Sequence, residues 1–173
     1  MSRPRRQLPV RVERPQGRRS QRLAGFDYAH VGAYFVTIVA HGRAPVFGSI
    51  EAGSMVLSPL GELAHTLWMA IPDRHSGVHI DAHVLMPDHA HGLILLTGSD
   101  DVVTEASGST KRTTTLGAVV RAWKALVTLE GRRLGLVHGP LWQRGYHDRI
   151  VRDAEAFEQI RRYIIANPAN WEP

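Results

Sequence analysis

The residues best suited to chemistry begin with His89 and His91, which flank Ala90 at the start of an apolar run that continues to Leu96. Residues two apart in a strand point to the same face, so both imidazoles can bind one divalent metal ion. Such a pair, taken alone, is more often an ordinary surface or turn feature than a metal site. A metal site here therefore needs support from other residues.

Tyr163 and Asn167 supply that support near the C-terminus. They stand four residues apart in a segment that reads as a helix, so they share one helix face. A phenol with a pKa near ~10 is a weak nucleophile at neutral pH, and a metal ion on the phosphate would compensate for this. Imidazole nitrogens with a carboxamide oxygen suit Mg²⁺ or Mn²⁺ better than a closed zinc site. The set predicts cleavage and rejoining of DNA through a tyrosine.

Simpler interpretations of these residues stay open. Tyr163 could be the rim of a core stripe, and Asn167 could be an ordinary residue at a helix end. Asn167 also precedes Pro168, which disfavours a helical backbone and could turn its side chain away from Tyr163. His83 lies on a neighbouring predicted strand, and whether it shares the metal-binding face depends on the hairpin register.

The composition bounds the class of protein. A chain of 173 residues is long enough for one domain with a substantial core. It has no cysteine, which excludes disulfides, thiolate zinc sites and cysteine nucleophiles. Because no apolar run reaches the length of a membrane span and no apolar signal core stands at the N-terminus, we expect a cytoplasmic, nucleoid-associated protein.

Positive charge is concentrated at the N-terminus. Residues 1–22 hold eight arginines and one glutamate, a net +7 within a chain of net charge +5, so the remainder carries −2. A stretch with so few apolar residues predicts a disordered arm suited to a polyanion. Arg18 and Arg19 are its candidate DNA contacts, and a solubilising tail is the alternative interpretation.

The elements that would position these residues follow from periodicity. Residues 34–40 predict a strand, and residues 60–71 predict a helix that Pro72 ends. Residues 78–85 predict a strand with Val78, Ile80, Ala82 and Val84 on one side. Pro87 and Asp88 supply turn chemistry, so residues 89–96 are expected to return as its hairpin partner.

The second half continues the alternation. Residues 97–113 predict a flexible linker inside the domain, and residues 116–129 predict a helix. Residues 146–151 could form an edge strand. Asp153 is the expected N-cap of a last helix whose apolar stripe is Phe157, Ile160 and Ile164. The fold class is therefore α+β, an antiparallel sheet with packed helices.

These segments resemble a known family in their order along the chain. The matching stretches are Arg22 and Leu23, Asp27 and Tyr28, 34–37, 84–96 with its His-Ala-His, 120–124, 141–147, and Tyr163 to Pro168 with Trp171. Together they resemble the single-tyrosine transposases of the HUH nuclease superfamily, in particular the REP-associated tyrosine transposases. The resemblance covers residues 23–173 as one domain and implies a ferredoxin-like, RRM-like sheet.

The resemblance implies an activity and a site. It implies that His89, His91 and Asn167 bind Mg²⁺ or Mn²⁺ and that Tyr163 is the nucleophile forming a 5′-phosphotyrosine. It also implies a single-stranded DNA substrate with hairpin structure and either a monomer or a homodimer. Two alternatives stay open: a catalytically silent, domesticated protein that only binds DNA hairpins, and an unrelated metal hydrolase that uses the histidine pair.

Further candidate DNA contacts come from a helix and a loop. Arg121 and Lys124 stand three apart on one helix face and could meet phosphates, although a solvated basic edge explains them equally well. Trp142 and Arg144 follow Gly139 and Pro140 in a loop. An exposed aromatic there could stack on an unpaired base, or Trp142 could plug the core.

Overall fold

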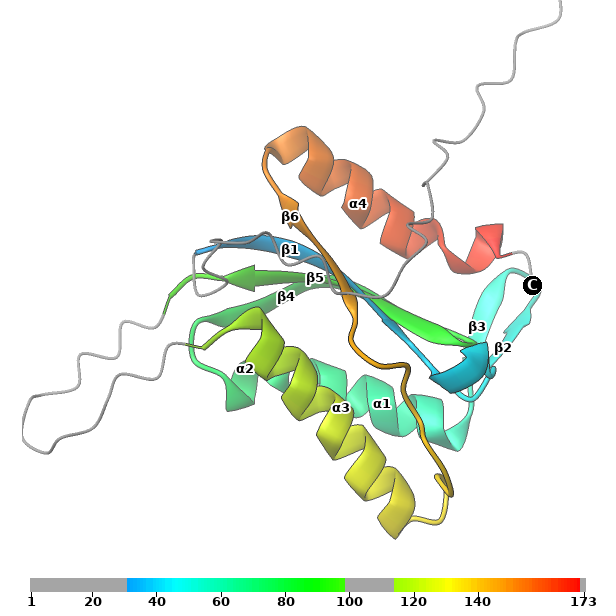
Figure 1. Ribbon diagram of the computed structural model, residues 1–173. Helices are drawn as coiled ribbons and strands as arrows, with labels where there is room; N and C mark the ends of the chain where they lie inside the picture. The colour runs from blue at the N-terminus through cyan, green and yellow to red at the C-terminus, as the bar shows by residue number, and fades with distance from the viewer. Residues whose placement is uncertain (1–30, 99–113, 172–173) are drawn as a thin grey trace, which may run out of the picture.

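The computed structural model describes residues 31–98 and 114–171 and has a four-stranded sheet at its centre (Figure 1). Its strands are β1 (Gly32–Val39), β4 (Val78–Met86), β5 (His89–Leu96) and β6 (His147–Val151). They lie in the order β4-β5-β1-β6, with every neighbouring pair antiparallel. This is the order of a ferredoxin-like sheet, and it confirms the predicted fold class, the hairpin at Pro87 and Asp88, and the edge strand.

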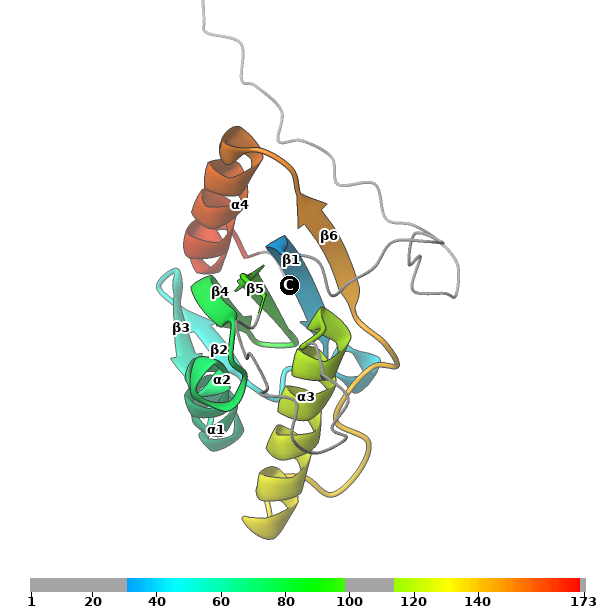
Figure 2. The ribbon, with the colours of Figure 1, turned by 90° about the vertical axis from the view of Figure 1, so that its left-hand side faces the viewer.

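Three helices cover one face of this sheet: α1 (Pro59–Met69), α2 (Ile71–Arg74) and α3 (Leu116–Arg133) (Figures 1 and 2). Trp68 of α1 and Trp123 of α3 meet edge to face with ring centroids 4.9 Å apart, and the Trp123 indole donates to the Ala64 carbonyl. Pro72 does not end the first helix. That helix ends at Met69, and Pro72 lies in the first turn of α2, where a missing N–H costs nothing. The α3 helix also runs four residues beyond the predicted end.

One helix, α4 (Ala154–Ala166), covers the opposite face, above β4 and β5 (Figures 1 and 2). The predicted cap is confirmed, because the Asp153 carboxylate accepts the Ala156 N–H at 2.7 Å. The predicted stripe is confirmed as well. Ile160 and Ile164 are buried against the sheet in a small second core, and Phe157 packs at its edge. The sheet therefore separates a large core from a small one.

A bulge in β4 corrects one sequence prediction. Ile80 pairs with Ile94 and Ala82 pairs with Leu93, so Asp81 is an extra residue in the ladder. An extra residue shifts the alternation by one, and the side chains beyond it move to the other face. Val78 consequently packs in the large core and Ala82 packs beside α4, so the expected single apolar side was wrong.

Sequence analysis missed a second, two-stranded sheet between the first strand and the first helix. It consists of β2 (Gly48–Glu51) and β3 (Ser54–Leu57), joined by a tight turn in which Ala52 and Gly53 both have positive φ. Two short 3-10 turns are present in the described residues as well: η1 (His41–Arg43) follows β1, and η2 (Pro168–Asn170) follows α4. The strands were missed because each is only four residues long, which leaves too short a pattern to recognise.

Two predicted segments lie outside the described residues. They are the arm at residues 1–22, including Arg18 and Arg19, and residues 99–113 of the predicted linker. Within residues 31–98 and 114–171, no helix is both long enough and apolar enough to cross a membrane.

Candidate active site

The two histidines of β5 lie on the sheet face that α4 covers. His89 is 8% exposed and His91 is 6% exposed. Their Nε2 atoms face each other at 3.1 Å, with the two rings nearly perpendicular. The alternation of the strand therefore does what the sequence predicted: it brings two nitrogen donors to one point.

The other nitrogen of each ring is already engaged. The Nδ1 of His89 lies 2.5 Å from a carboxylate oxygen of Asp88, and the Nδ1 of His91 lies 2.9 Å from the Thr37 hydroxyl. Burial, reinforced by the neighbouring His89, lowers the pKa of His91 to about 3. His91 is therefore neutral at physiological pH, which is the form of imidazole that binds metals.

Tyr163 reaches this point from α4. Its hydroxyl lies 3.3 Å from the Nε2 of His91, although the side chain is 49% exposed. Phe35 of β1 joins the two: it stacks on His91 at 5.2 Å and meets Tyr163 edge on at 6.0 Å. A phenol open to solvent and two buried nitrogens thus lie together at one end of this sheet face.

Asn167 follows α4 with a helical backbone, φ −57° and ψ −46°, so the bias expected before Pro168 does not hold. The chain instead tightens into η2, and Asn167 continues the face of Tyr163 one turn later. Asn167 is buried, which is unusual for a carboxamide at a helix end. Its position relative to Tyr163 is the one that the sequence predicted.

The donors fit a hard divalent cation. Two neutral imidazoles converge, each anchored through Nδ1 as metal-binding histidines usually are. In the described part of the chain there is no cluster of three or more histidine, cysteine or acidic residues able to hold a metal. The Asn167 carboxamide, one helical turn after Tyr163, could add an oxygen ligand of the kind that Mg²⁺ and Mn²⁺ prefer.

The hairpin register settles the position of His83. It pairs with Gly92, so it points to the face opposite His91 and cannot share a metal with it. There it lies 2.9 Å from the Nδ1 of His65, beside Trp68. His83 therefore lies beside the large core and is not part of the site.

Sequence reasoning missed the residues that support the site. Thr37 was hidden because its role depends on pairing directly opposite His91, which only the register reveals. Asp88 was interpreted as a turn former, although its carboxylate is buried beside His89. A clue was present: a carboxylate next to a histidine of a candidate metal pair is a common orienting partner.

The candidate DNA contacts divide into two kinds. Trp142 packs between Phe47 and Trp123, and its indole donates to the Lys124 carbonyl, so the core interpretation describes it. Lys124 is half-buried and its ammonium donates to the carbonyls of residues 143 and 145, at 3.0 and 2.8 Å. Arg121 and Arg144 are exposed and free to meet an anion on steric grounds.

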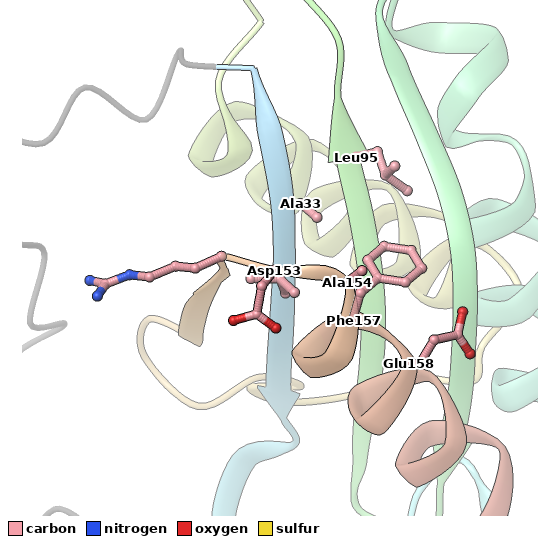
Figure 3. A pocket seen from close by; sticks show the side chains of 8 residues that line it. Ala33, Leu95, Asp153, Ala154, Phe157 and Glu158 are labelled. Carbon is pink, nitrogen blue, oxygen red and sulfur yellow. The ribbon is translucent and has the colours of Figure 1, made fainter.

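A shallow pocket of about 330 Å³ lies at the opposite end of α4 (Figure 3). Ala33, Leu95 and Phe157 form its apolar floor, with Asp153 and Glu158 at the rim. None of the candidate residues lines it. The candidate catalytic and metal-binding residues lie at the Tyr163 end of α4, away from this pocket.

Comparison with known proteins identifies relatives of the chain and of its fold. No family model matches the sequence. An uncharacterized protein of Haemophilus influenzae is 34% identical over an alignment of 169 positions, and the match covers 90% of this chain and 90% of the other. A REP-associated tyrosine transposase solved with a REP hairpin superposes with a TM-score of 0.56 at 16% identity, over 83% of this chain and 70% of the other. The chain thus belongs to one family with the Haemophilus influenzae protein and has the fold of a REP-associated tyrosine transposase.

Proposed function

We propose that this protein is a transposase of the single-tyrosine HUH family, a metal-dependent endonuclease and strand transferase for single-stranded DNA. The observation that carries the proposal is the convergence of the His89 and His91 Nε2 atoms with the Tyr163 hydroxyl, within 3.1 and 3.3 Å. Two nitrogen donors and a nucleophile at one point are what phosphoryl transfer through a tyrosine requires. The shared fold supports the same conclusion.

The reaction exchanges one phosphoester for another. The Tyr163 oxygen attacks the phosphorus, the bond to the 3′ oxygen breaks, and a 5′-phosphotyrosyl ester and a free 3′-hydroxyl result. The phenolic proton passes to solvent, to which half of the Tyr163 side chain is open, and the leaving 3′ oxygen takes up a proton from solvent. Because the new ester retains the energy of the old one, reversal on another 3′-hydroxyl rejoins the strand without ATP.

The residues of this chain prepare that step. Mg²⁺ or Mn²⁺, held by His89, His91 and the Asn167 carboxamide, would supply Lewis acidity to a non-bridging phosphate oxygen. Phe35 restricts the Tyr163 ring through its edge contact and so limits where the phenol can attack. The low pKa of His91 keeps its ring from becoming a competing cation near the phosphate at neutral pH.

The proposed substrate is DNA with hairpin-forming repeats. The transposase of the same fold is bound to a REP hairpin, and hairpin recognition is proposed here by extension. The exposed guanidinium groups of Arg121 and Arg144 are the proposed phosphate contacts within the described residues, and Arg18 and Arg19 are those of the N-terminal arm. Residues 23–173 are proposed to act as one domain.

The decisive experiment incubates the protein with labelled single-stranded hairpin DNA from the repeats beside its own gene, with Mn²⁺ or with EDTA. Denaturing electrophoresis then detects any covalent protein-DNA product. We expect such a product with wild type and Mn²⁺, and none with Tyr163→Phe or with EDTA. Loss of the nucleophile leaves at most a small residual rate, so the expected decrease is at least about 1000-fold.

Tyr146→Phe is the matched control. It also removes a phenol hydroxyl, but Tyr146 packs at the edge of the large core on the other side of the sheet. It should form the covalent product at the wild-type rate. Covalent product from Tyr163→Phe would overturn the proposal, as would tight hairpin binding by wild type with no cleavage in Mn²⁺, which would show a binding protein instead.

A further inference from the structure

Asp88 is a buried acid whose position a turn does not explain. It lies in the two-residue turn between β4 and β5 and is 6% exposed, whereas turn aspartates usually face solvent and bond to their own turn. The turn is already held by main-chain bonds: Ala40 donates to the Asp88 carbonyl and Phe47 donates to the Pro87 carbonyl. The carboxylate is therefore not needed to hold the turn. Burying a carboxylate is costly unless it has partners.

Both carboxylate oxygens have a partner. One lies 2.5 Å from the Nδ1 of His89, and the other accepts from the Nη1 of Arg43 at 3.0 Å. An ionised carboxylate can only accept hydrogen bonds, so the proton of His89 must be on Nδ1. Its Nε2 then carries a lone pair, and this lone pair faces the Nε2 of His91.

The two histidines therefore differ in how firmly their tautomers are fixed. Thr37, the partner of His91, is a hydroxyl, which can donate or accept. The tautomer of His91 can follow whatever binds at Nε2, whereas that of His89 is fixed by the charge of Asp88. His89 is the anchored donor of the pair, and the ring of Trp171, 5.6 Å away, packs against it.

Arg43 reaches Asp88 from an unusual backbone position. It ends the η1 turn with φ +55°, a left-handed conformation that a residue with a side chain rarely adopts. Its side chain is 68% exposed and touches Asp88 through one nitrogen only. A strained backbone that places a guanidinium on a buried carboxylate is typical of a functional constraint.

We propose that Asp88 and Arg43 are positioning residues that fix His89 in the Nδ1–H tautomer, with Nε2 available to a divalent cation. Asp88 sets the tautomer and ring orientation, and Arg43 holds the Asp88 carboxylate in place. Neither touches the substrate or the metal. The proposal rests on the proposed function only for the use of that cation, because the tautomer itself is a property of the metal-free protein.

The first test reads the tautomer directly. Long-range proton-nitrogen NMR correlations on the full-length, ¹⁵N-labelled, metal-free protein distinguish Nδ1–H from Nε2–H, at a pH well above the ordinary imidazole pKa of about 6.5. We expect His89 to be Nδ1–H in wild type. In Asp88→Asn the carboxamide can donate to Nδ1, so we expect a shift toward Nε2–H. An unchanged tautomer in Asp88→Asn would overturn the proposal.

The second test measures Mn²⁺ affinity by titration calorimetry without DNA. Loss of an orienting partner typically costs about 10- to 100-fold in metal affinity, and we expect Asp88→Asn to fall in that range. Arg43→Gln should weaken binding less, by under about 10-fold, and Arg43→Lys should recover part of that loss. Arg43→Gln also keeps the proposal testable if Asp88→Asn does not fold.

Asp81→Asn is the matched control. Asp81 forms another Arg–Asp pair between separate elements, with Arg161 at 3.2 Å, and it touches neither histidine of the site. Its Mn²⁺ affinity and its His89 tautomer should equal those of wild type. Equal affinity losses in Asp81→Asn and Asp88→Asn would overturn the positioning role. Failure of wild type to cut DNA would count against the proposed function alone, because neither readout involves DNA.

Discussion

The two faces of the sheet are built for different purposes. On one face, α1 and α3 cover a large apolar core that includes Trp68, Trp123 and Tyr34, all nearly inaccessible. On the other face, α4 buries only a small cluster around Leu93 and Ile164, and the remaining area carries His89, His91 and Tyr163. The same strand, β5, serves both faces through alternate residues.

The difference shows how this chain separates the residues that stabilise the fold from those of the proposed site. Burial of large apolar side chains supplies most folding free energy, so the helix-covered face can be expected to hold the sheet together. That rigid sheet lets the other face hold polar groups that contribute little to folding or oppose it. Substitutions on the face covered by α1 and α3 should therefore mainly lower stability, and substitutions on the α4 face should mainly affect the polar groups. The following predictions test this contrast from the largest expected effect to the smallest.

Gly92→Ala should cause the largest loss of stability. A Cβ at Gly92 would lie 2.2 Å from the Trp68 ring, which is fixed between the sheet and Trp123. Overpacking of this kind forces backbone or ring displacement, and we expect a loss of about 3 kcal/mol in the free energy of unfolding. Urea unfolding monitored by circular dichroism measures it.

Gly139→Ala is the control for that substitution, because a Cβ there would meet no atom within 4 Å. We expect its free energy of unfolding to stay within about 0.5 kcal/mol of wild type. If Gly92→Ala were equally mild, the helix-covered face would be more adaptable than its packing indicates, and the contrast between the faces would fail.

Acidification should lower the free energy of unfolding through His83, the histidine beside the large core. Burial, and then the neighbouring His65, lowers the pKa of His83 from 6.5 to about 4. The unfolded chain takes up the proton first, so stability is full above about pH 6.5 and decreases as the pH falls toward 4. After allowance for solvent screening, the share of His83 is on the order of 1 kcal/mol.

His83→Gln removes that share, so its unfolding free energy should change less than that of wild type between pH 6.5 and 4. Part of the slope should remain, because the pKa of His91 is lowered as well, to about 3. His79→Gln, at an exposed position on the same strand, should keep the wild-type slope. Identical slopes in all three proteins would refute the assignment. Denaturant titrations at several pH values, without metal, provide the comparison.

The smallest expected effects concern two basic residues of α3, Lys124 and Arg121, which are expected to act on stability and on DNA binding respectively. Lys124 donates to two loop carbonyls, so Lys124→Gln should cost about 1 kcal/mol of stability. Exposed Arg121 makes no comparable contribution, and Arg121→Gln should leave stability within about 0.5 kcal/mol while lowering the salt dependence of hairpin binding by about one ion. Fluorescence anisotropy across a salt series measures the latter, and an unchanged slope would exclude Arg121 from the DNA interface.

Much of the fold was predictable because its signals are local. The hairpin at Pro87, the cap at Asp153 and the stripe through Ile160 depend on residues close together in sequence. The bulge at Asp81 was not predictable from sequence, because it depends on β4 contributing side chains to two different cores at once. The hairpin β2–β3 was missed for a different reason: strands of four residues leave too short a pattern.

The site divides in the same way. The pairing of His89 with His91 and of Tyr163 with Asn167 follows from the periods of a strand and a helix, so sequence sufficed for their relative placement. Their meeting, and the support from Thr37 and Arg43, depends on pairing between segments about 50 residues apart or more and on a left-handed backbone. Such contacts have no signature in a single sequence.

The half-exposed position of Tyr163 has a consequence for how this scaffold can change. Its ring fills no core space, and its hydroxyl makes one long contact, to His91. Exposed side chains of this kind can be replaced at little cost to folding, so the fold does not protect the proposed nucleophile. If the proposed function holds, a protein that cuts DNA and one that only binds it differ on this scaffold by a single oxygen atom, and catalysis can be lost without loss of structure.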